Sequence, residues 1–309
     1  MFSVVIPIYN SRATLERCLT SLLKQSYKDF EAIIIDDGSI DDGFDYCKGL
    51  AAREDRFEVY QMPHLGVSAI RQYGITLAKG NWIVFLDSDD YLPDDGLKSL
   101  AESISNNSDC DIVVGNYCID NNGSICSVSN CFESKYSYIY QFLSFGDVNT
   151  SLWGKAIRKS VLSKSEVSFE KGVDICEDYL FLATLFLYTD RIVFVSDTVY
   201  YWTIGSDHCL TRSRFTDFAT KTKVLEQIEF RYSQHNKEKY LPAINRAKFN
   251  TYIMYAGSTL LPDVDVLSKP VFSLAGISNK GLSNKELVIK LLLQLGLRRL
   301  AVNLYSKIY

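Results

Sequence analysis

The sequence has little of what a membrane-spanning or nucleic-acid-binding protein needs. Its longest apolar stretches are about ten residues, whereas a helix that crosses a bilayer needs about 20. Basic residues are not in excess, because 33 lysines and arginines face 37 aspartates and glutamates. The net charge of −4 therefore argues against a globally basic nucleic-acid binder, and we expect no nucleic-acid partner. No basic segment precedes the apolar run that begins at Phe2, so we expect no signal peptide and a cytoplasmic protein.

Closely spaced metal ligands of the zinc type are also missing. The 8 cysteines contain no C-x-x-C pair, and the three histidines lie far apart in the chain, at His64, His208 and His235. A zinc site usually needs closely paired ligands, so none is indicated. A disulfide within Cys110–Cys131 would require secretion, for which nothing else in the sequence speaks. We interpret the cysteines as reduced and mostly buried.

Several common catalytic motifs are absent as well. No G-x-G-x-x-G follows the first predicted strand, and no G-x-x-x-x-G-K-[ST] or G-x-S-x-G occurs. Dinucleotide oxidoreductases, P-loop enzymes and hydrolases with a nucleophile elbow therefore become poor explanations. If phosphates bind, a metal ion must neutralise much of their charge.

The first hundred residues alternate between strand and helix patterns. Helical spacing of apolar residues runs from Leu15 to Leu23 and from Val67 to Ala78. The intervening apolar runs predict strands at Ser3–Tyr9, Phe30–Ile35, Phe57–Gln61 and Trp82–Leu86. Continuously hydrophobic strands separated by helices indicate an α/β fold, with a mostly parallel sheet covered by helices on both faces.

The rest of the chain changes character twice. Short strands and turns are expected near 106–131, a helix over Asp178–Leu187 and an extended segment over Val193–Trp202. Beyond Phe215 the pattern is mainly helical. We therefore expect an α/β domain over residues 1–212 and a helical C-terminal region over 213–309.

The C-terminal end of the chain is basic and rich in leucine. Residues 280–309 contain six lysines and arginines against a single acidic residue, Glu286. A helix of this kind can lie on an anionic membrane surface. The same pattern also fits a packed terminal helix whose charges are solvated, and the sequence leaves both interpretations open.

Acidic residues follow two of the predicted strands. Asp36 and Asp37 come after the second strand, and Asp87-Ser88-Asp89-Asp90 comes after the fourth. Ligands of open parallel sheets bind at the carboxyl ends of the strands, where these residues gather. Because so many carboxylates repel one another, a hard divalent cation that also binds phosphate oxygens is the physical solution.

Four segments, taken in their order along the chain, closely resemble the motifs of family 2 glycosyltransferases with the GT-A fold: Val4–Asn10, Asp36–Asp41, Gly66–Arg71 and Gly80–Asp90. The resemblance continues in Leu152–Lys155 and Cys176–Phe181, and it covers roughly residues 2–212. It implies a metal-dependent inverting hexosyltransferase (EC 2.4) that moves a sugar from a UDP-sugar to a hydroxyl group. The implied acceptor is a glycan or lipid-linked glycan, as in capsular polysaccharide, exopolysaccharide or O-antigen synthesis. Such an enzyme would work at the inner face of the cell membrane, with peripheral contact through residues 280–309, and a homodimer stays open.

The resemblance also implies a nucleotide-sugar site. Asp89 would ligate a Mn²⁺ or Mg²⁺ ion bound to the diphosphate, and Asp87 would contact the ribose or the same metal. Asp37 would hydrogen-bond the uracil or the ribose. The other residues implied at the nucleotide-sugar are Pro7, Tyr9, Arg71 and Ser88.

An inverting transferase needs one base to take the proton of the attacking acceptor hydroxyl. The departing nucleoside diphosphate is stabilised by a metal, so no general acid is required. The family pattern favours Asp178 as this base, with Glu177 orienting it or the acceptor. Taken alone, the pair also fits the acidic first turn of a helix. Trp153 and Lys155 are implied to line the sugar and acceptor pocket, although a buried tryptophan and a surface lysine are simpler interpretations.

One segment departs from the family pattern. Many relatives carry an arginine where this chain has Thr203, and His208 or Arg212 is the candidate to reach the diphosphate instead. Two alternatives remain open at this point. Asp87-Ser88-Asp89 could serve a Mg²⁺-dependent phosphohydrolase, although such a motif normally follows the first strand. The chain could also be an inactive partner subunit of a transferase complex.

Overall fold

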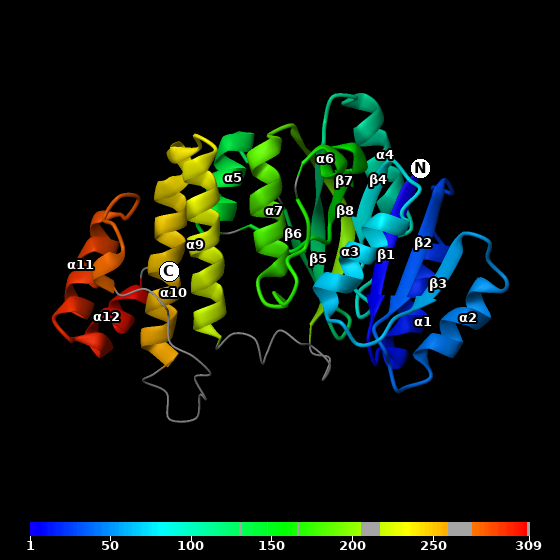
Figure 1. Ribbon diagram of the computed structural model, residues 1–309, viewed down its shortest axis with the longest axis horizontal. Helices are drawn as coiled ribbons and strands as arrows, with labels where there is room; N and C mark the ends of the chain where they lie inside the picture. Colours follow the sequence, from blue (N-terminus) through cyan, green and yellow to red (C-terminus); the bar gives the residue numbers. More distant parts are fainter. Residues whose placement is uncertain (130–131, 147, 166, 205–216, 259–273, 308–309) are drawn as a thin grey trace. The chain divides into compact units, whose positions relative to one another are not determined.

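The computed structural model describes residues 1–309 except 130–131, 147, 166, 205–216, 259–273 and 308–309 (Figure 1). The chain forms two compact units. The first comprises Met1–Lys135 and Ser151–Cys209, and the second comprises Tyr136–Thr150 and Leu210–Tyr309. The predicted α/β fold with a helical C-terminal region is confirmed.

The first unit is built on an eight-stranded sheet with the order β3-β2-β1-β4-β7-β5-β6, in which β8 also pairs with β5. Pairing is parallel among β1 to β4 and between β5 and β8, and antiparallel for β4 with β7 and for β5 with β6 and β7. The strands are β1 (Phe2–Ile8), β2 (Phe30–Asp36), β3 (Phe57–Gln61), β4 (Trp82–Phe85), β5 (Ile112–Asn121), β6 (Ser124–Val128), β7 (Lys155–Arg158) and β8 (Ile192–Ile204). The four parallel strands predicted from apolar runs are therefore present.

Helices cover both faces of this sheet (Figure 1). Apolar side chains of α1 (Arg12–Leu23), α2 (Gly43–Ala51) and α4 (Gly96–Asn106) share a core cluster with Val4 and Ile6 of β1. Neighbouring side chains of a strand point to opposite faces, so Val5 lies on the other side. There Val5 meets α3 (Val67–Leu77). Two further helices of this unit, α6 (Lys159–Lys164) and α7 (Glu177–Tyr188), follow later in the chain.

Gly74 allows α3 to approach the sheet closely. A Cβ atom at this position would lie 2.4 Å from Cγ1 of Val5 and 3.2 Å from Cδ1 of Ile35, so any side chain would push the helix away. Arg71 lies one helical turn before Gly74. Because α3 packs closely on the sheet, the Arg71 side chain lies near the carboxyl ends of the central strands.

The second unit is helical. It contains most of α5 (Lys135–Leu143), together with α9 (Phe218–Gln234), α10 (Leu241–Ser258), α11 (Asn284–Gln294), α12 (Arg298–Tyr305) and the short turns η1 (Glu238–Tyr240) and η2 (Leu274–Gly276). Its core gathers Phe249 and Ile253 of α10 with Ile289 and Leu293 of α11. Within the described ranges, no helix has both the length and the apolar character needed to cross a membrane.

Candidate active site

A buried arginine lies at the centre of the acidic edge of the sheet. One terminal nitrogen of Arg71 donates to Oε1 of Glu177 (3.0 Å) and to Oδ1 of Asp178 (2.7 Å), and the other donates to Oδ1 of Asp87 (2.9 Å). The Arg71 side chain is only 6% exposed. The fold joins Arg71 to carboxylates that lie 16 and 107 residues further along the chain.

The charges in this cluster act strongly on one another. Burial would lower the pKa of Arg71, but the carboxylates of Asp178, Asp87 and Glu177 raise it above its ordinary value. Arg71 is thus a permanent cation. Burial raises the pKa of Asp178, and the positive charge of Arg71 opposes that rise. The arrangement holds an ionisable carboxylate in a poorly hydrated place, where it binds a proton more readily than a surface aspartate does.

Asp178 is held in place from three sides. It lies in the first turn of α7, where the helix dipole favours a carboxylate. Its Oδ2 accepts a hydrogen bond from the Leu152 amide (3.1 Å), while its Oδ1 accepts from Arg71. Cys176, immediately before the helix, has a φ of +60°, an uncommon conformation for a residue with a side chain. Such strain clusters at functional sites because surrounding contacts must hold it.

The acidic turn after β4 is anchored by its own contacts. Asp90 is buried, and its two oxygens accept from the hydroxyl of Tyr200 (2.7 Å) and the amide of Thr203 (2.7 Å). Ser88 donates to the hydroxyl of Ser11 (2.8 Å). Arg17 donates to the carbonyl of Asp89 (2.7 Å) and to the hydroxyl of Thr203 (2.8 Å). Asp90 therefore stabilises the turn that contains Asp87 and Asp89.

Asp87 and Asp89 suit a divalent cation that is shared with a phosphate-bearing ligand. Two carboxylates at the end of one strand are the donor set with which Mg²⁺ or Mn²⁺ is usually held beside phosphate oxygens and water. Among the described residues, no group of three or more histidine, cysteine, aspartate or glutamate side chains could hold an ion by itself. The residues thus fit an ion whose coordination a diphosphate completes.

The end of β1 faces a loop that connects β3 to α3. Asp37 is buried, and its oxygens accept from the amides of Leu65 (2.6 Å) and Gly66 (3.1 Å). The ring of Tyr9 is 45% exposed and stacks on His64, with ring centroids 4.4 Å apart. Pro7 lies in β1, and Tyr9 follows the end of that strand. The sequence pattern did not single out His64, and only its place in the loop between β3 and α3 could have suggested it.

Trp153 and Lys155 are both interior residues. The Trp153 ring stacks on Tyr200, with centroids 4.6 Å apart, and forms a T-shaped pair with Tyr117, with centroids 4.9 Å apart. Lys155 is 1% exposed, and its Nζ donates to the carbonyl of Ser151 (2.7 Å). Burial lowers the pKa of Lys155 to about 7, against the opposing charge of Asp178. The two candidates for a contact with the diphosphate, His208 and Arg212, lie outside the described residues.

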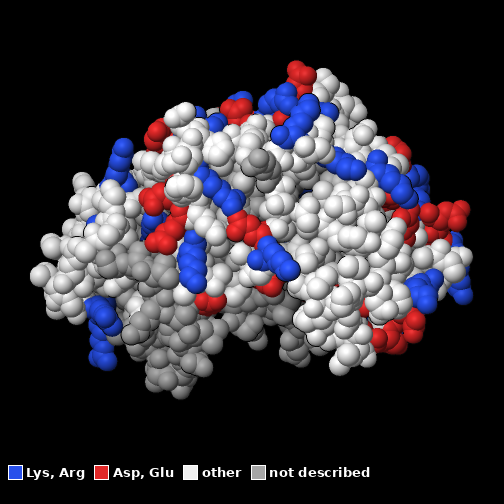
Figure 2. Space-filling view, in the orientation of Figure 1, with Lys and Arg blue, Asp and Glu red and all other residues white. Residues whose placement is uncertain are grey.

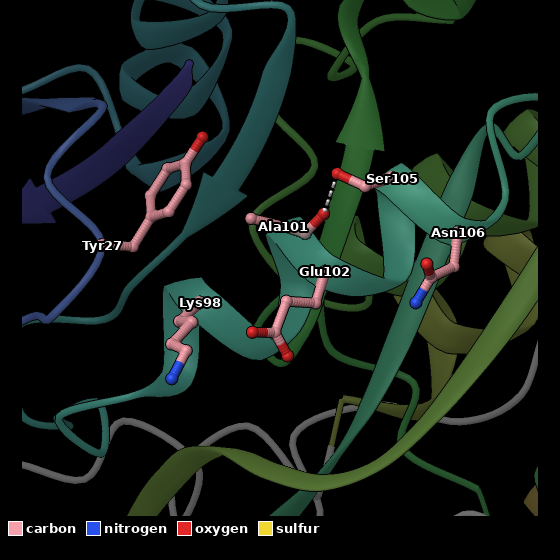
Figure 3. Close-up of a pocket in the computed structure, with 6 residues that line it drawn as sticks. All are labelled: Tyr27, Lys98, Ala101, Glu102, Ser105 and Asn106. Atoms are coloured by element: carbon pink, nitrogen blue, oxygen red, sulfur yellow. Dashed lines mark hydrogen bonds between the residues drawn. The ribbon is translucent and has the colours of Figure 1, made fainter.

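Two surface hollows lie away from this cluster. One, of about 340 Å³, is formed by Tyr27 and residues of α4, among them Lys98 and Glu102 (Figure 3). The other, of about 890 Å³, lies between α1 and the Tyr91–Tyr201 ring pair. No residue that lines either hollow belongs to the Arg71 cluster. On the face seen in Figure 2, basic and acidic side chains are interspersed, in keeping with the balanced charge of the sequence.

Comparison with known proteins identifies the family. Residues 3–165 match the family described as "Glycosyl transferase family 2". The glycosyltransferase GlyG of Streptococcus pneumoniae is 30% identical over 213 residues, which are 65% of this chain and 69% of GlyG. The poly(ribitol-phosphate) beta-N-acetylglucosaminyltransferase TarP of Staphylococcus aureus is 29% identical, over 77% of this chain and 75% of TarP. The match to the pneumococcal glycosyltransferase GlyA, 26% identical over 65% of this chain, spans only 30% of GlyA.

Solved structures show the same fold. S. aureus TarS in complex with UDP-GlcNAc superposes with a TM-score of 0.65 at 21% identity, covering 82% of this chain and 80% of the other. A mannosyltransferase of Pyrobaculum calidifontis, in complex with GDP-Man and Mn²⁺, gives a TM-score of 0.55 at 15% identity, covering 85% and 76%. The order of motifs predicted from the sequence, the sheet that carries them and these matches agree: the chain belongs to glycosyltransferase family 2 and is a glycosyltransferase.

Proposed function

We propose that this glycosyltransferase is a metal-dependent inverting enzyme that transfers a sugar from a UDP-sugar to a hydroxyl group of a glycan acceptor. The observation that carries the proposal is the cluster in which Arg71 joins Asp87, at the end of β4, to Asp178, at the start of α7. It brings the acidic turn of the expected donor site next to the expected base.

Asp178 is the base in this proposal. A carboxylate with a raised pKa accepts the proton of the acceptor hydroxyl more readily than an ordinary aspartate while that oxygen attacks the anomeric carbon. Arg71 and the Leu152 amide each hold one carboxylate oxygen, so the orientation of the base is fixed before the acceptor arrives. Glu177 shares the Arg71 guanidinium and helps to orient this pair.

The donor lies at the ends of β1, β2 and β4 in this proposal. Asp87 and Asp89 would hold the divalent ion, which supplies charge stabilisation for the departing diphosphate. Tyr9, with His64 stacked on it, offers an exposed aromatic surface for the base of the nucleotide. Asp37 fixes the neighbouring loop through Leu65 and Gly66, and Pro7 and Ser88 complete the border.

Relatives support the choice of donor and acceptor class. TarS is solved with UDP-GlcNAc, and TarP is named for a poly(ribitol-phosphate) acceptor. The manganese in the mannosyltransferase complex supports a divalent cation. We therefore propose a UDP-sugar donor and a cell-surface polysaccharide, or its lipid-linked precursor, as the acceptor.

Calorimetric titration of UDP, with and without Mn²⁺, tests the donor site. We expect binding that needs Mn²⁺ and is lost in Asp89→Ala. Asp94→Ala, which removes an exposed carboxylate just beyond the acidic turn, is the matched control and should bind as the unaltered protein does. Absence of UDP binding at millimolar concentration with Mn²⁺ would refute the proposal. Phosphatase activity that Asp87→Asn abolishes would favour the phosphohydrolase alternative instead.

The exposed leucines of the second unit favour a membrane surface. Five large apolar side chains are 47–65% exposed: Val288, Leu291, Leu295, Leu297 and Leu300. Arg298 and Arg299 are exposed beside them, whereas Lys290 is buried and donates to Asn279. Apolar and basic side chains together suit the surface of an anionic bilayer. We propose this as the membrane contact of the enzyme.

Vesicle flotation tests that contact. The protein should float with vesicles that contain anionic lipid and not with neutral ones, and Leu295→Gln combined with Leu300→Gln should reduce flotation. Phe230→Gln on α9 removes another exposed apolar side chain, 66% exposed, and should have no effect. If the leucine changes instead convert a dimer into monomers and leave flotation unchanged, the surface is a homodimer contact.

A further inference from the structure

Lys155 is a buried lysine that the proposed transfer does not use. It is the first residue of β7, and its side chain is enclosed by protein, with 1% of its surface exposed. Taking an ammonium group out of water is costly, and an apolar side chain of similar length would fill the same space without that cost. The position therefore calls for an explanation in which the amino group itself acts.

The Lys155 amino group contacts one end of a peptide group whose other end holds Asp178. Lys155 Nζ donates to the carbonyl oxygen of Ser151 (2.7 Å). The nitrogen of that same peptide is the Leu152 amide, which donates to Oδ2 of Asp178 (3.1 Å). One amide thus lies between the amino group of Lys155 at its oxygen and the carboxylate of Asp178 at its N–H. Hydrogen bonds in such a chain polarise and strengthen one another in a low-dielectric interior.

We propose that Lys155 is a positioning residue for Asp178, acting through the Ser151–Leu152 peptide. By holding the Ser151 carbonyl, Lys155 fixes the direction of the Leu152 N–H and strengthens its bond to the carboxylate. This inference rests on the proposed function for the role of Asp178 as the base, but the contact itself can be tested without any substrate.

Several groups surround Asp178, and each must be separated from Lys155 in the test. Arg71 holds Oδ1 of Asp178, and Asp87 and Glu177 contact the same guanidinium. The Leu152 amide instead holds Oδ2, the oxygen on the side of the Ser151–Leu152 peptide. The Leu152 amide therefore reports the Lys155 contact more directly than any property of the whole cluster.

The test measures the Leu152 amide proton by NMR. Combined ¹³C-serine and ¹⁵N-leucine labelling selects the Ser–Leu steps of the chain, at 21–22, 99–100, 151–152 and 273–274. Leu152→Ile removes one of these signals and so assigns it. At neutral pH, Lys155→Met should move the Leu152 signal upfield, in the direction that Asp178→Asn also moves it.

Lys159→Met is the matched control. Lys159 begins α6, and its Nζ also donates to a backbone carbonyl, that of Ala78. Its loss removes a lysine–carbonyl hydrogen bond of the same kind at a carbonyl far from the Ser151–Leu152 peptide in the chain. The Leu152 signal should stay where it is in this variant.

Kinetics supply the second measurement. In Lys155→Met, kcat for release of UDP from the donor should fall about 10- to 100-fold, the cost seen when a group that orients a metal ligand is removed. The KM for the donor should not change, because in this proposal Lys155 acts on the base and not on the donor. Lys155→Arg keeps a side chain that can donate a hydrogen bond to the Ser151 carbonyl, so it should recover part of the lost kcat. It also serves as the second variant if Lys155→Met does not fold.

Three results would overturn the positioning role of Lys155 or separate it from the proposed function. An unchanged Leu152 signal in Lys155→Met overturns the positioning role, even if kcat falls. A changed donor KM with unchanged kcat would make Lys155 part of the sugar pocket and equally overturn it. A shifted Leu152 signal in a protein that binds no UDP would leave the Lys155 contact standing and refute the proposed function.

Discussion

Each of the two units buries a charged cluster, and the two clusters are built differently. In the second unit, Glu286 accepts from Arg246 (3.0 Å) and closes a capping box with Ser283 at the start of α11. In the first unit, three carboxylates converge on the single guanidinium of Arg71. The second-unit cluster satisfies a helix terminus, as a capping box does in many proteins. Convergence of like charges on one cation has no such structural need, and it marks the place where chemistry is expected.

The two clusters also differ in how far apart their residues lie in the chain. Glu286 and Ser283 lie three residues apart, so local sequence alone brings them together. Arg71, Asp87 and Asp178 come from α3, the end of β4 and the start of α7. Only the parallel sheet, with its common carboxyl edge, places these three elements beside one another.

Replacement of the base should have the largest effect on activity. Asp178→Asn keeps the shape of the side chain but cannot accept the proton, so sugar transfer should fall by about 10²- to 10⁴-fold. The assay is UDP release from the donor with acceptor present. Asp190→Asn, which changes an exposed carboxylate paired with Lys135, is the control. Full activity in Asp178→Asn would show that another group takes the proton.

Loss of the central cation should have the largest effect on stability. Arg71→Met leaves three carboxylates near one another without their guanidinium and should lower the free energy of unfolding by about 3–5 kcal/mol. Arg246→Met should cost clearly less, because Glu286 keeps its capping-box bonds to Ser283. Urea denaturation of both variants measures the difference. Equal losses would mean that the two clusters are equivalent structural ion pairs.

The smallest expected effect is a dependence of stability on pH. Because burial raises the pKa of Asp178 above its ordinary value of 3.8, the folded protein binds this proton more tightly than the unfolded chain does. The favourable contribution of the protonated group is complete below pH 3.8 and is lost as the pH rises through the raised pKa. Asp178→Asn should therefore be more stable than the unaltered protein at neutral pH, and the advantage should shrink on acidification. The midpoint of urea denaturation at several pH values measures this, and a constant difference would contradict it.

The same raised pKa governs activity in the opposite sense. The base works only when it is deprotonated, so transfer should decline with falling pH at a value above the ordinary range of aspartate. A pH profile of kcat for the unaltered protein checks this. An acid limb at the ordinary value would contradict the burial of Asp178 as the cause.

Much of the candidate site was predictable because parallel strands end at one edge. Apolar runs predicted the strands, and the acidic turns after them, Asp36–Asp37 and Asp87–Asp90, followed directly. The resemblance to the family then singled out Asp37, Asp87 and Asp89 within those turns. Burial of single side chains was less predictable. Lys155 fits a surface lysine by composition, yet the strand β7 in which it lies is inserted between β4 and β5, and its side chain is enclosed.

The sequence by itself determined the α/β class, the order of the motifs and the family, because hydrophobic periodicity and the residues at strand ends are local properties. The tertiary structure alone decided that Arg71 is buried among Asp87, Glu177 and Asp178, and that Lys155 reaches the peptide that holds Asp178. Such contacts join residues far apart in the chain, and their strength depends on the exclusion of water. Spacing in a sequence carries no information on that exclusion, which arises only when the elements pack.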